Sequence, residues 1–387
     1  MQLFSNEQVN MEVLRKRAFN YRWAVTDSDV IPLTAADPDF PVAKEILDGI
    51  RNFVGEGYFS YGSPEGNAEF KEAIAEWYGL NYNSRLNPQH ILPVNSAAHG
   101  LFVAVSSVLS RGDSAIIPDP VDFLFRKSVE AAGADVITCQ VDKTTAELSI
   151  ERLEQLIRKD TRAILLCNPN NPLGKKYSKS YLNELIAFAL KHDLWIISDE
   201  IWADITFEGR VTSLFDTSFE HFEKKLVVSG LSKNFGLAGL RIGYILCPSA
   251  EVFMNVLEAS GHRSTAFGIP ILSQAAGTAA LKNAAYWLDE FKVHLLSMKK
   301  LVHQFMEAHP MLLNCSFDST YLAFPKLAEG VGSEEFVQST LELARVALVP
   351  GGTQWFESAS EGHVRICFAT SEKILNEAFS RMLEVAK

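Results

Sequence analysis

Short apolar runs alternate with longer helical segments through the first two thirds of the chain. Apolar, β-branched runs predict buried strands, and three of them end at Cys167, Asp199 and Gly230. Segments with helical spacing, such as 179–191, lie between strands of this kind. This alternation predicts βαβ units, and therefore a mostly parallel sheet flanked by helices.

The last third of the chain has a different pattern. Strand-like runs at 321–324, 346–349 and 363–368 occur among helices, and apolar residues with helical spacing mark an amphipathic helix at 371–385. We therefore expect an α/β protein with a smaller α+β domain. The predicted division is an N-terminal arm with a segment of the small domain (1–40), a large domain (41–285) and a small C-terminal domain (286–387).

The span 91–110 contains no charged residue, which resembles a membrane helix. Proline, asparagine, histidine and serine residues interrupt it, so a short strand followed by a buried helix starting near Ser96 fits better. The N–H groups of a first helical turn, here those of Ser96, Ala97 and Ala98, have no helical partner and favour a phosphate.

Composition and charge exclude several classes of protein. The 387 residues are 47% hydrophobic and 21% charged, as in ordinary globular proteins, and the net charge of −11 argues against a nucleic-acid surface. The five cysteines lack the spacing of a disulfide framework or a metal site. The first residues contain no export signal. We therefore expect a cytoplasmic protein that binds no nucleic acid, membrane or metal.

Chemically useful side chains follow three of the predicted strands. Lys233 comes after the strand ending at Gly230, Asp199 closes another, and Asn171 lies in the Asn/Pro/Gly turn after the third. The carboxyl ends of parallel strands share one sheet edge, where α/β proteins hold ligands. A lysine near apolar walls and a second cation loses its proton easily and can form a Schiff base. Arg241 supplies that cation, and its planar fork suits a phosphate.

The segments that carry these residues form three motifs, in the order NPNNPLG (168–174), SDEIW (198–202) and SGLSKNF with GLRIGY (229–235 and 239–244). Together they resemble the class I/II pyridoxal-phosphate (PLP) aminotransferases of fold type I, which are similar to aspartate aminotransferase. The similarity extends from about Pro32 to the region of Arg365. It includes the C–S lyase branch with cystathionine β-lyase, which the DEIxxD pattern at 199–204 resembles more closely. It implies a large domain with a mostly parallel, seven-stranded sheet.

The resemblance also implies roles for individual residues. Lys233 would hold PLP as a Schiff base and move the Cα proton of the substrate, while Asp199 would pair with the pyridinium nitrogen. Asn171 would bond the ring hydroxyl, and Arg365 would bind the substrate carboxylate. An arginine inside an apolar strand is costly unless it is paired, which independently favours a functional Arg365. The other expected contacts are with the cofactor phosphate (Ser96, Ala97, Ala98, Ser232 and Arg241) and with the substrate (Ala36 and Asn171).

Two positions depart from the family pattern. The family usually has an aromatic residue that stacks on the cofactor ring, where this chain has Asp122 with Phe123 beside it. Either Phe123 takes the stacking role or this face of the ring is different here. Trp202 stands where the family commonly has a tyrosine or histidine, and an indole only donates a hydrogen bond.

The resemblance implies a homodimer with shared active sites, because the equivalent of Tyr61 reaches the cofactor phosphate of the other subunit. The predicted function is transfer of an amino group from an amino acid to a 2-oxo acid. The alternatives are a C–S β-lyase that releases pyruvate, ammonia and a thiol, and a non-enzymatic PLP-binding regulator. The regulator is disfavoured because neither end of the chain has room for a basic DNA-binding module.

Overall fold

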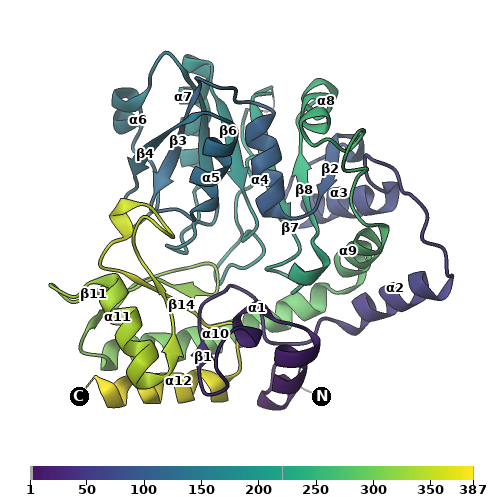
Figure 1. Ribbon diagram of the computed structural model, residues 1–387. Coiled ribbons are helices and arrows are strands. Elements are labelled where there is room, and N and C mark those ends of the chain that lie inside the picture. The colour runs from purple at the N-terminus through teal and green to yellow at the C-terminus, as the bar shows by residue number, and fades with distance from the viewer. Residues whose placement is uncertain (1–2, 220, 387) are drawn as a thin grey trace.

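The computed structural model describes residues 3–219 and 221–386. Figure 1 shows an upper part built on a large sheet and a lower part of helices with short strands. The first and last described residues lie in the lower part. Within the described residues, no helix combines the length and apolarity needed to cross a membrane.

The upper part is organised by one seven-stranded sheet. Within the described chain, β8 alone runs antiparallel to its neighbours, and the other pairings are parallel. This confirms the predicted mostly parallel sheet. In order across the sheet, the strands are β2 (Ile91–Val94), β8 (Gly243–Leu246), β7 (Lys225–Gly230), β6 (Trp195–Asp199), β5 (Thr161–Cys167), β3 (Ser114–Asp119) and β4 (Asp135–Gln140).

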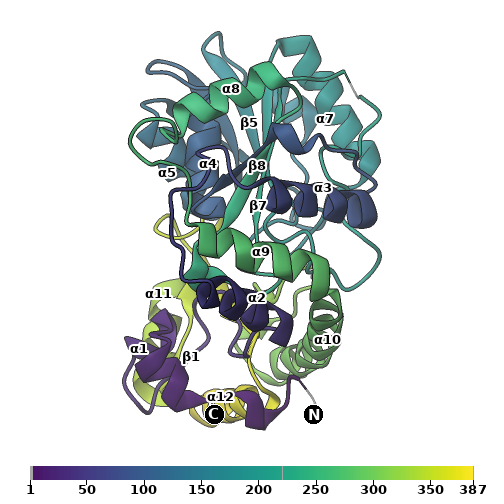
Figure 2. The same cartoon turned by 90° about the vertical axis from the view of Figure 1, so that its right-hand side faces the viewer.

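The central strands are apolar along their whole length because both sheet faces are covered. Every residue of β7 is buried, as are Ile196 and Ile197 of β6, which is expected for parallel strands between two helical layers. Figure 2 shows α4 and α5 on one side of the sheet and α3 and α7 on the other. The helices of this part are α3 (Ala68–Tyr82), α4 (Ala97–Ser106), α5 (Leu124–Ala131), α6 (Ile150–Leu156), α7 (Lys179–His192) and α8 (Ala250–Ala259).

The lower part joins segments from both ends of the sequence. Its three strand groups are β1 (Ile31–Pro32) with β12 (Val346–Ala347), β9 (Leu312–Leu313) with β11 (Lys326–Leu327), and β10 (Leu322–Ala323) with β14 (Val364–Cys367) and β13 (Val349–Pro350). Around them lie α1 (Tyr21–Ala24), α10 (Ala285–Ala308), α11 (Ser333–Ser339) and α12 (Glu372–Val385).

The helix expected at 371–385 forms as α12, and Ser371 caps it by accepting a hydrogen bond from the amide of Ile374. Its apolar stripe faces α10, where the rings of Phe305 and Phe379 stack with centroids 4.0 Å apart. The pairing of β1 with β12 places the start of the chain beside its last third. The exact domain boundaries remain a prediction.

Two long helices lie between the parts. α2 (Lys44–Gly55) packs closely on α9 (Ile271–Asn283), and a Cβ added to Gly49 would lie 2.8 Å from the Cβ of Ala279. The span 91–110 forms β2 and α4, as its interrupted apolar pattern predicts. Before α1, Asn6–Gln8 forms a 3-10 helix and Val13–Arg17 forms a π-helical segment. It stops before Phe19, whose φ of 49° is left-handed and does not continue a helix.

Candidate active site

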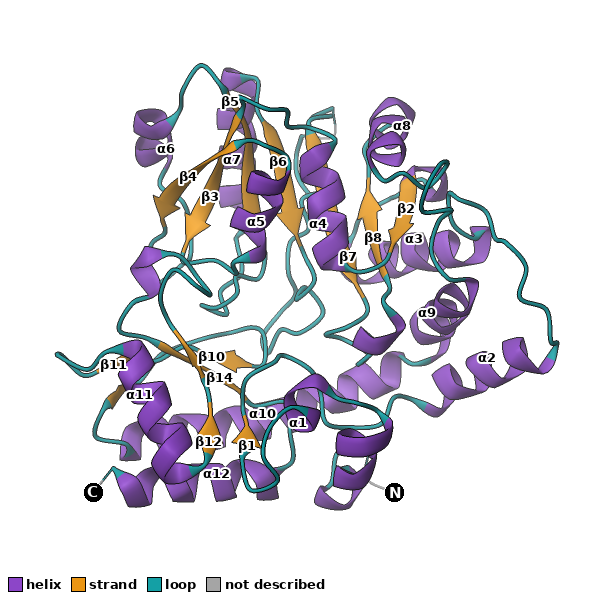
Figure 3. Ribbon diagram, viewed as in Figure 1, coloured by secondary structure: helices purple, strands orange, loops and turns teal. Residues whose placement is uncertain are grey.

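A cavity of about 540 Å³ lies where the upper and lower parts meet. Figure 3 shows the strands β3 and β6 pointing their carboxyl ends toward β10 and β14 across this junction. Its lining includes Asn171 after β5, Asp199 at the end of β6, Lys233 after β7 and Arg365 from β14. Three neighbouring strand ends therefore deliver their polar side chains to one place, as the sequence pattern indicates.

Lys233 is carried by the short turn that follows β7. Its Nζ donates to the carbonyl of Ala36 (2.6 Å) and lies 5.5 Å from the ring centre of Trp202. Burial lowers the pKa of Lys233, and the nearby Arg365 lowers it further, whereas Asp37 opposes this shift. The amine is therefore easier to deprotonate than that of a surface lysine, as a nucleophile or base must be.

Asp199 is the last residue of β6, and its buried carboxylate accepts few hydrogen bonds. Its Oδ1 accepts one hydrogen bond, from the amide of Ile201 (3.0 Å). Burial raises the pKa of Asp199 to about 7, and Asp122 adds to the rise, while the Ile201 amide and Lys233 oppose it. A cationic group placed beside Asp199 would restore its ionised form.

A chain of hydrogen bonds joins Arg365, Asn171 and Asp122. Arg365 Nη1 donates to Asn171 Oδ1 (3.3 Å), and Asn171 Nδ2 donates to Asp122 Oδ2 (2.9 Å). A second guanidinium nitrogen of Arg365 donates to the carbonyl of Thr34 (3.1 Å). Among the described residues, Arg365 Nε is buried without a hydrogen-bond partner. The guanidinium thus keeps donor capacity for a further acceptor, such as a carboxylate.

The opposite end of the cavity collects hydrogen-bond donors. Ser96, Ala97 and Ala98 line it at the start of α4, where backbone N–H groups lack helical acceptors. Arg241 Nη2 donates to Ser96 Oγ (2.9 Å). A Cβ on Gly243 of β8 would lie 2.6 Å from the Ala97 nitrogen, so glycine permits this close approach of strand and helix. The arrangement suits a phosphate.

Arg241 itself has a left-handed backbone, with φ 50° and ψ 64°. Such a conformation is unfavourable for a side chain with a Cβ, and it is found where a functional position requires it. It follows the single turn Ala238–Leu240 and points the guanidinium toward the start of α4.

The remaining predicted site residues divide into two groups. Ala36, Ser232 and Trp202 line the cavity with Lys233. Tyr61 and Phe123 are absent from its lining in this chain. The Tyr61 side chain is 93% exposed, and the Phe123 ring packs edge-on against Trp355 at 5.8 Å. Of the two interpretations of the 122–123 pair, the structure places Asp122 and not Phe123 at the cavity.

Sequence reasoning missed Trp355 and Asp37 as neighbours of the site. Trp355 lines the cavity, and its carbonyl accepts a hydrogen bond from the amide of Phe123 (2.9 Å), although the two residues are distant in sequence. The negative charge of Asp37 acts to raise the pKa of Lys233. Asn20 donates a hydrogen bond to Asp37 Oδ2 (3.0 Å). The Pro/Asp-rich segment that contains Asp37 was the available signal.

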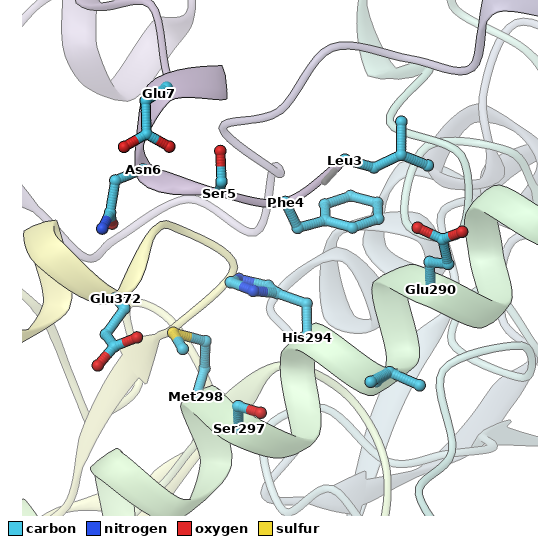
Figure 4. Close-up of a pocket in the computed structure, with 11 residues that line it drawn as sticks. Leu3, Phe4, Ser5, Asn6, Glu7, Glu290, His294, Ser297, Met298 and Glu372 are labelled. Carbon is cyan, nitrogen blue, oxygen red and sulfur yellow. The ribbon is translucent and has the colours of Figure 1, made fainter. Parts of the chain in front are cut away.

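A second cavity, of about 490 Å³, has a different character. Figure 4 shows Phe4 and Glu7 of the N-terminal segment facing His294 of α10, with Glu290 and Glu372 nearby. The His294 ring is already engaged, because it packs on Phe4 and its Nε2 lies 2.8 Å from the Thr370 carbonyl oxygen. Among the described residues of its lining, there is no lysine or arginine. This cavity lies under the N-terminal segment and does not share the chemistry of the Lys233 site.

Comparisons with known proteins find relatives that match most of this chain. A family model described as aminotransferase class I and II matches residues 28–382. An aspartate aminotransferase from Thermotoga maritima is 31% identical over 360 residues, which cover 92% of this chain and 90% of that protein. The crystal structure of an aromatic aminotransferase from Pyrococcus horikoshii superposes with a TM-score of 0.85 and 28% identity, covering 95% of this chain and 98% of that one.

Cystalysin from Treponema denticola, whose crystal structure contains pyridoxal 5′-phosphate, superposes with a TM-score of 0.89. It is 22% identical to this chain, and the match covers 99% of this chain and 98% of that one. At this identity the likeness shows a shared fold only.

Proposed function

Because this chain belongs to the class I and II aminotransferases and is a PLP-dependent enzyme, we propose that it transfers the amino group of an amino acid to a 2-oxo acid at Lys233. The observation that carries the proposal is the meeting of Lys233, Asp199 and Arg365 in one cavity. These residues supply an amine, a partner for a cationic ring and a partner for a carboxylate.

The residues of the cavity fit PLP in three respects. The unpaired amides at the start of α4, next to Arg241, suit the phosphate. Asp199 has a raised pKa and one local hydrogen bond, so a pyridinium nitrogen would supply the cation that it lacks. Asn171 Nδ2 donates to Asp122, and its second N–H can donate to a ring oxygen.

When bound, PLP withdraws electrons from the Cα of the amino acid attached to it. The protein then has to orient the substrate and move protons. Arg365 holds the substrate carboxylate, which fixes the position of Cα in the cavity. Lys233 Nζ, with its pKa lowered by burial, takes the proton from Cα. Trp202 covers Lys233 with an apolar face and so limits access of water to the amine.

The pattern that suggested the C–S lyases has a structural explanation here. Asp204, the last residue of the DEIxxD pattern, accepts hydrogen bonds from Trp77 Nε1 (3.1 Å), Tyr82 Oη and Asn234 Nδ2 (2.6 Å). It lies outside the cavity lining. Asp204 therefore ties α3 to the Lys233 segment, and the pattern adds no group that favours β-elimination.

The proposed function is tested by supplying an S-substituted cysteine with an uncharged side chain, such as S-ethylcysteine, to the PLP-loaded enzyme with and without a 2-oxo acid. Transamination requires the acceptor, so turnover should start only after the 2-oxo acid is added. Sustained release of pyruvate and ammonia without an acceptor would instead identify β-elimination as the main activity.

We further propose that the enzyme is a homodimer in which Tyr61 completes the phosphate site of the partner subunit. Tyr61 lies among exposed aromatic side chains: Tyr58 is 78% exposed, Phe59 63% and Phe267 59%. The Tyr61 ring lies 5.9 Å from that of Phe267. Clusters of this kind on a monomer surface are typical of protein interfaces.

Hybrid dimers test this proposal. Tyr61→Phe and Lys233→Ala should each impair activity, while an equimolar mixture should recover roughly a quarter of the wild-type activity per subunit. Random exchange makes half of the dimers mixed, and each mixed dimer has one complete site. Each variant mixed with itself is the control. No recovery, although mass spectrometry demonstrates subunit exchange, would exclude a shared site.

A further inference from the structure

The positive charges that line the active-site cavity already have partners or assigned roles. Lys233, Arg241 and Arg365 serve the amine, phosphate and carboxylate positions of the proposed function. The fourth lining cation is Arg22, whose Nη2 lies 2.6 Å from Asp39 Oδ1, with both side chains fully buried. Among the described lining residues, no arginine or lysine remains for a second carboxylate on the substrate.

Asp122 adds a negative charge to the same region. Its side chain lines the cavity, and both carboxylate oxygens accept hydrogen bonds, Oδ2 from Asn171 and Oδ1 from the Leu124 amide (3.1 Å). Accepted bonds of this kind favour the ionised form. Burial raises the pKa of Asp122, whereas the guanidinium of Arg365, linked through Asn171, opposes this rise and favours the ionised form.

The hydrogen bond from Leu124 at the start of α5 explains the position of only one carboxylate oxygen of Asp122. The bond from Leu124 to Oδ1 lies at the start of α5 and is the ordinary use of an aspartate before a helix. That contact needs one oxygen, whereas Oδ2 faces the Asn171 and Arg365 pair. An asparagine could keep the contact to Leu124 with its one oxygen, and it would lose the charge and the acceptor that faces Asn171.

Apolar residues line the cavity together with Asp122. They are Leu124 and Phe125, which follow Asp122 in the chain, and Val349 and Trp355. A substrate side chain that enters this region would meet aromatic and aliphatic surface together with one carboxylate. An acidic side chain would lose its hydration there without gaining a cation, and it would lie near a like charge.

We propose that Asp122 is a specificity-determining residue that excludes a second carboxylate, so that the amino donor of this enzyme has an uncharged, apolar side chain. This inference rests on the proposed function, because it assumes that Arg365 holds the α-carboxylate. Asp122 acts by repelling the distal end of an acidic substrate, and the wall around Trp355 selects an apolar group.

Binding of unreactive analogues tests the inference without turnover. Glutarate and 4-methylpentanoate are similar in size and share one carboxylate. At the far end, glutarate has a second carboxylate, which lies one methylene farther out than the isopropyl group of 4-methylpentanoate. Calorimetry with the PLP-loaded enzyme should give a Kd for 4-methylpentanoate at least about tenfold lower than that for glutarate. In Asp122→Asn, the ratio of the Kd for glutarate to the Kd for 4-methylpentanoate should fall at least about fivefold.

Two further variants isolate the charge. Asp119→Asn removes a neighbouring carboxylate that contacts Ser358 and the Ala359 amide outside the cavity, and it should leave the ratio unchanged. Asp122→Ser keeps an oxygen that can accept from Leu124, and it should change the ratio as Asp122→Asn does. Comparing the ratio within each variant cancels any shift of Arg365, since both analogues share its carboxylate.

The inference is overturned if the wild-type enzyme binds glutarate as tightly as 4-methylpentanoate, if it binds neither, or if both Asp122 variants keep the wild-type ratio. The proposed function fails separately, by absence of amino-group transfer. An enzyme that eliminates instead of transaminating would still show the predicted preference between analogues.

Discussion

Replacing Lys233 with alanine should lower turnover at least about 10⁴-fold. Among the described residues that line the cavity, Lys233 is the one amine, and it has a pKa lowered by burial. The same substitution removes the group that attaches the cofactor and the group that takes the Cα proton. Loss of both roles explains why this is the largest effect expected in the chain.

The measurement combines steady-state rates with the visible absorption of lysine-bound PLP. Lys233→Ala should lose the band as well as the rate, whereas Lys282→Ala, which removes an exposed lysine from α9, should keep both. A Lys233→Ala enzyme that retains the band would show that the cofactor is attached elsewhere.

Replacing Asp199 with asparagine should have opposite effects on the cofactor-free and PLP-loaded enzyme. Turnover should fall about 10²-fold or more, because a neutral amide no longer keeps the ring nitrogen protonated. The cofactor-free protein, by contrast, should become more stable above pH 7. The reason is that burial disfavours the ionised carboxylate, as the rise of its pKa to about 7 indicates.

The direction of the pH effect follows from proton binding. Between pH 4 and pH 7, approximately, the unfolded chain has released the Asp199 proton while the folded chain still holds it, since the folded pKa is about 7. The free energy of unfolding of the cofactor-free enzyme therefore falls as pH rises through this interval. Asp199→Asn removes that loss, which is worth roughly 4 kcal/mol at pH 8.

Urea unfolding of both cofactor-free proteins at pH 5 and pH 8 measures this difference. The two free energies of unfolding should diverge with rising pH, with the variant more stable at pH 8. Parallel pH dependences would mean that the Asp199 carboxylate is not destabilised by its surroundings.

The sequence predicts that the ends of β5, β6 and β7 lie together, because this arrangement depends on the apolar pattern within each strand. Each of β5, β6 and β7 is a nearly continuous apolar run, and parallel strands of this type must lie side by side under helices. Once they do, Asn171, Asp199 and Lys233 reach one edge regardless of the details of packing.

Contacts between distant segments do not follow from such patterns. The link from Arg365 through Asn171 to Asp122 depends on how β14 of the lower part faces the sheet. The position of Phe123 depends on Trp355, which comes from a loop that no periodicity places. Tyr61 is exposed in a single chain, and the role proposed for it requires a second subunit.

A single-turnover experiment tests the central claim most directly. PLP-loaded enzyme of known site concentration is mixed with an amino acid of uncharged side chain and no acceptor, and the 2-oxo acid formed is counted. The account predicts about one equivalent per Lys233 site, after which the reaction stops until a 2-oxo acid is added. Product that accumulates well beyond one equivalent without an acceptor, or no 2-oxo acid at all, would contradict it.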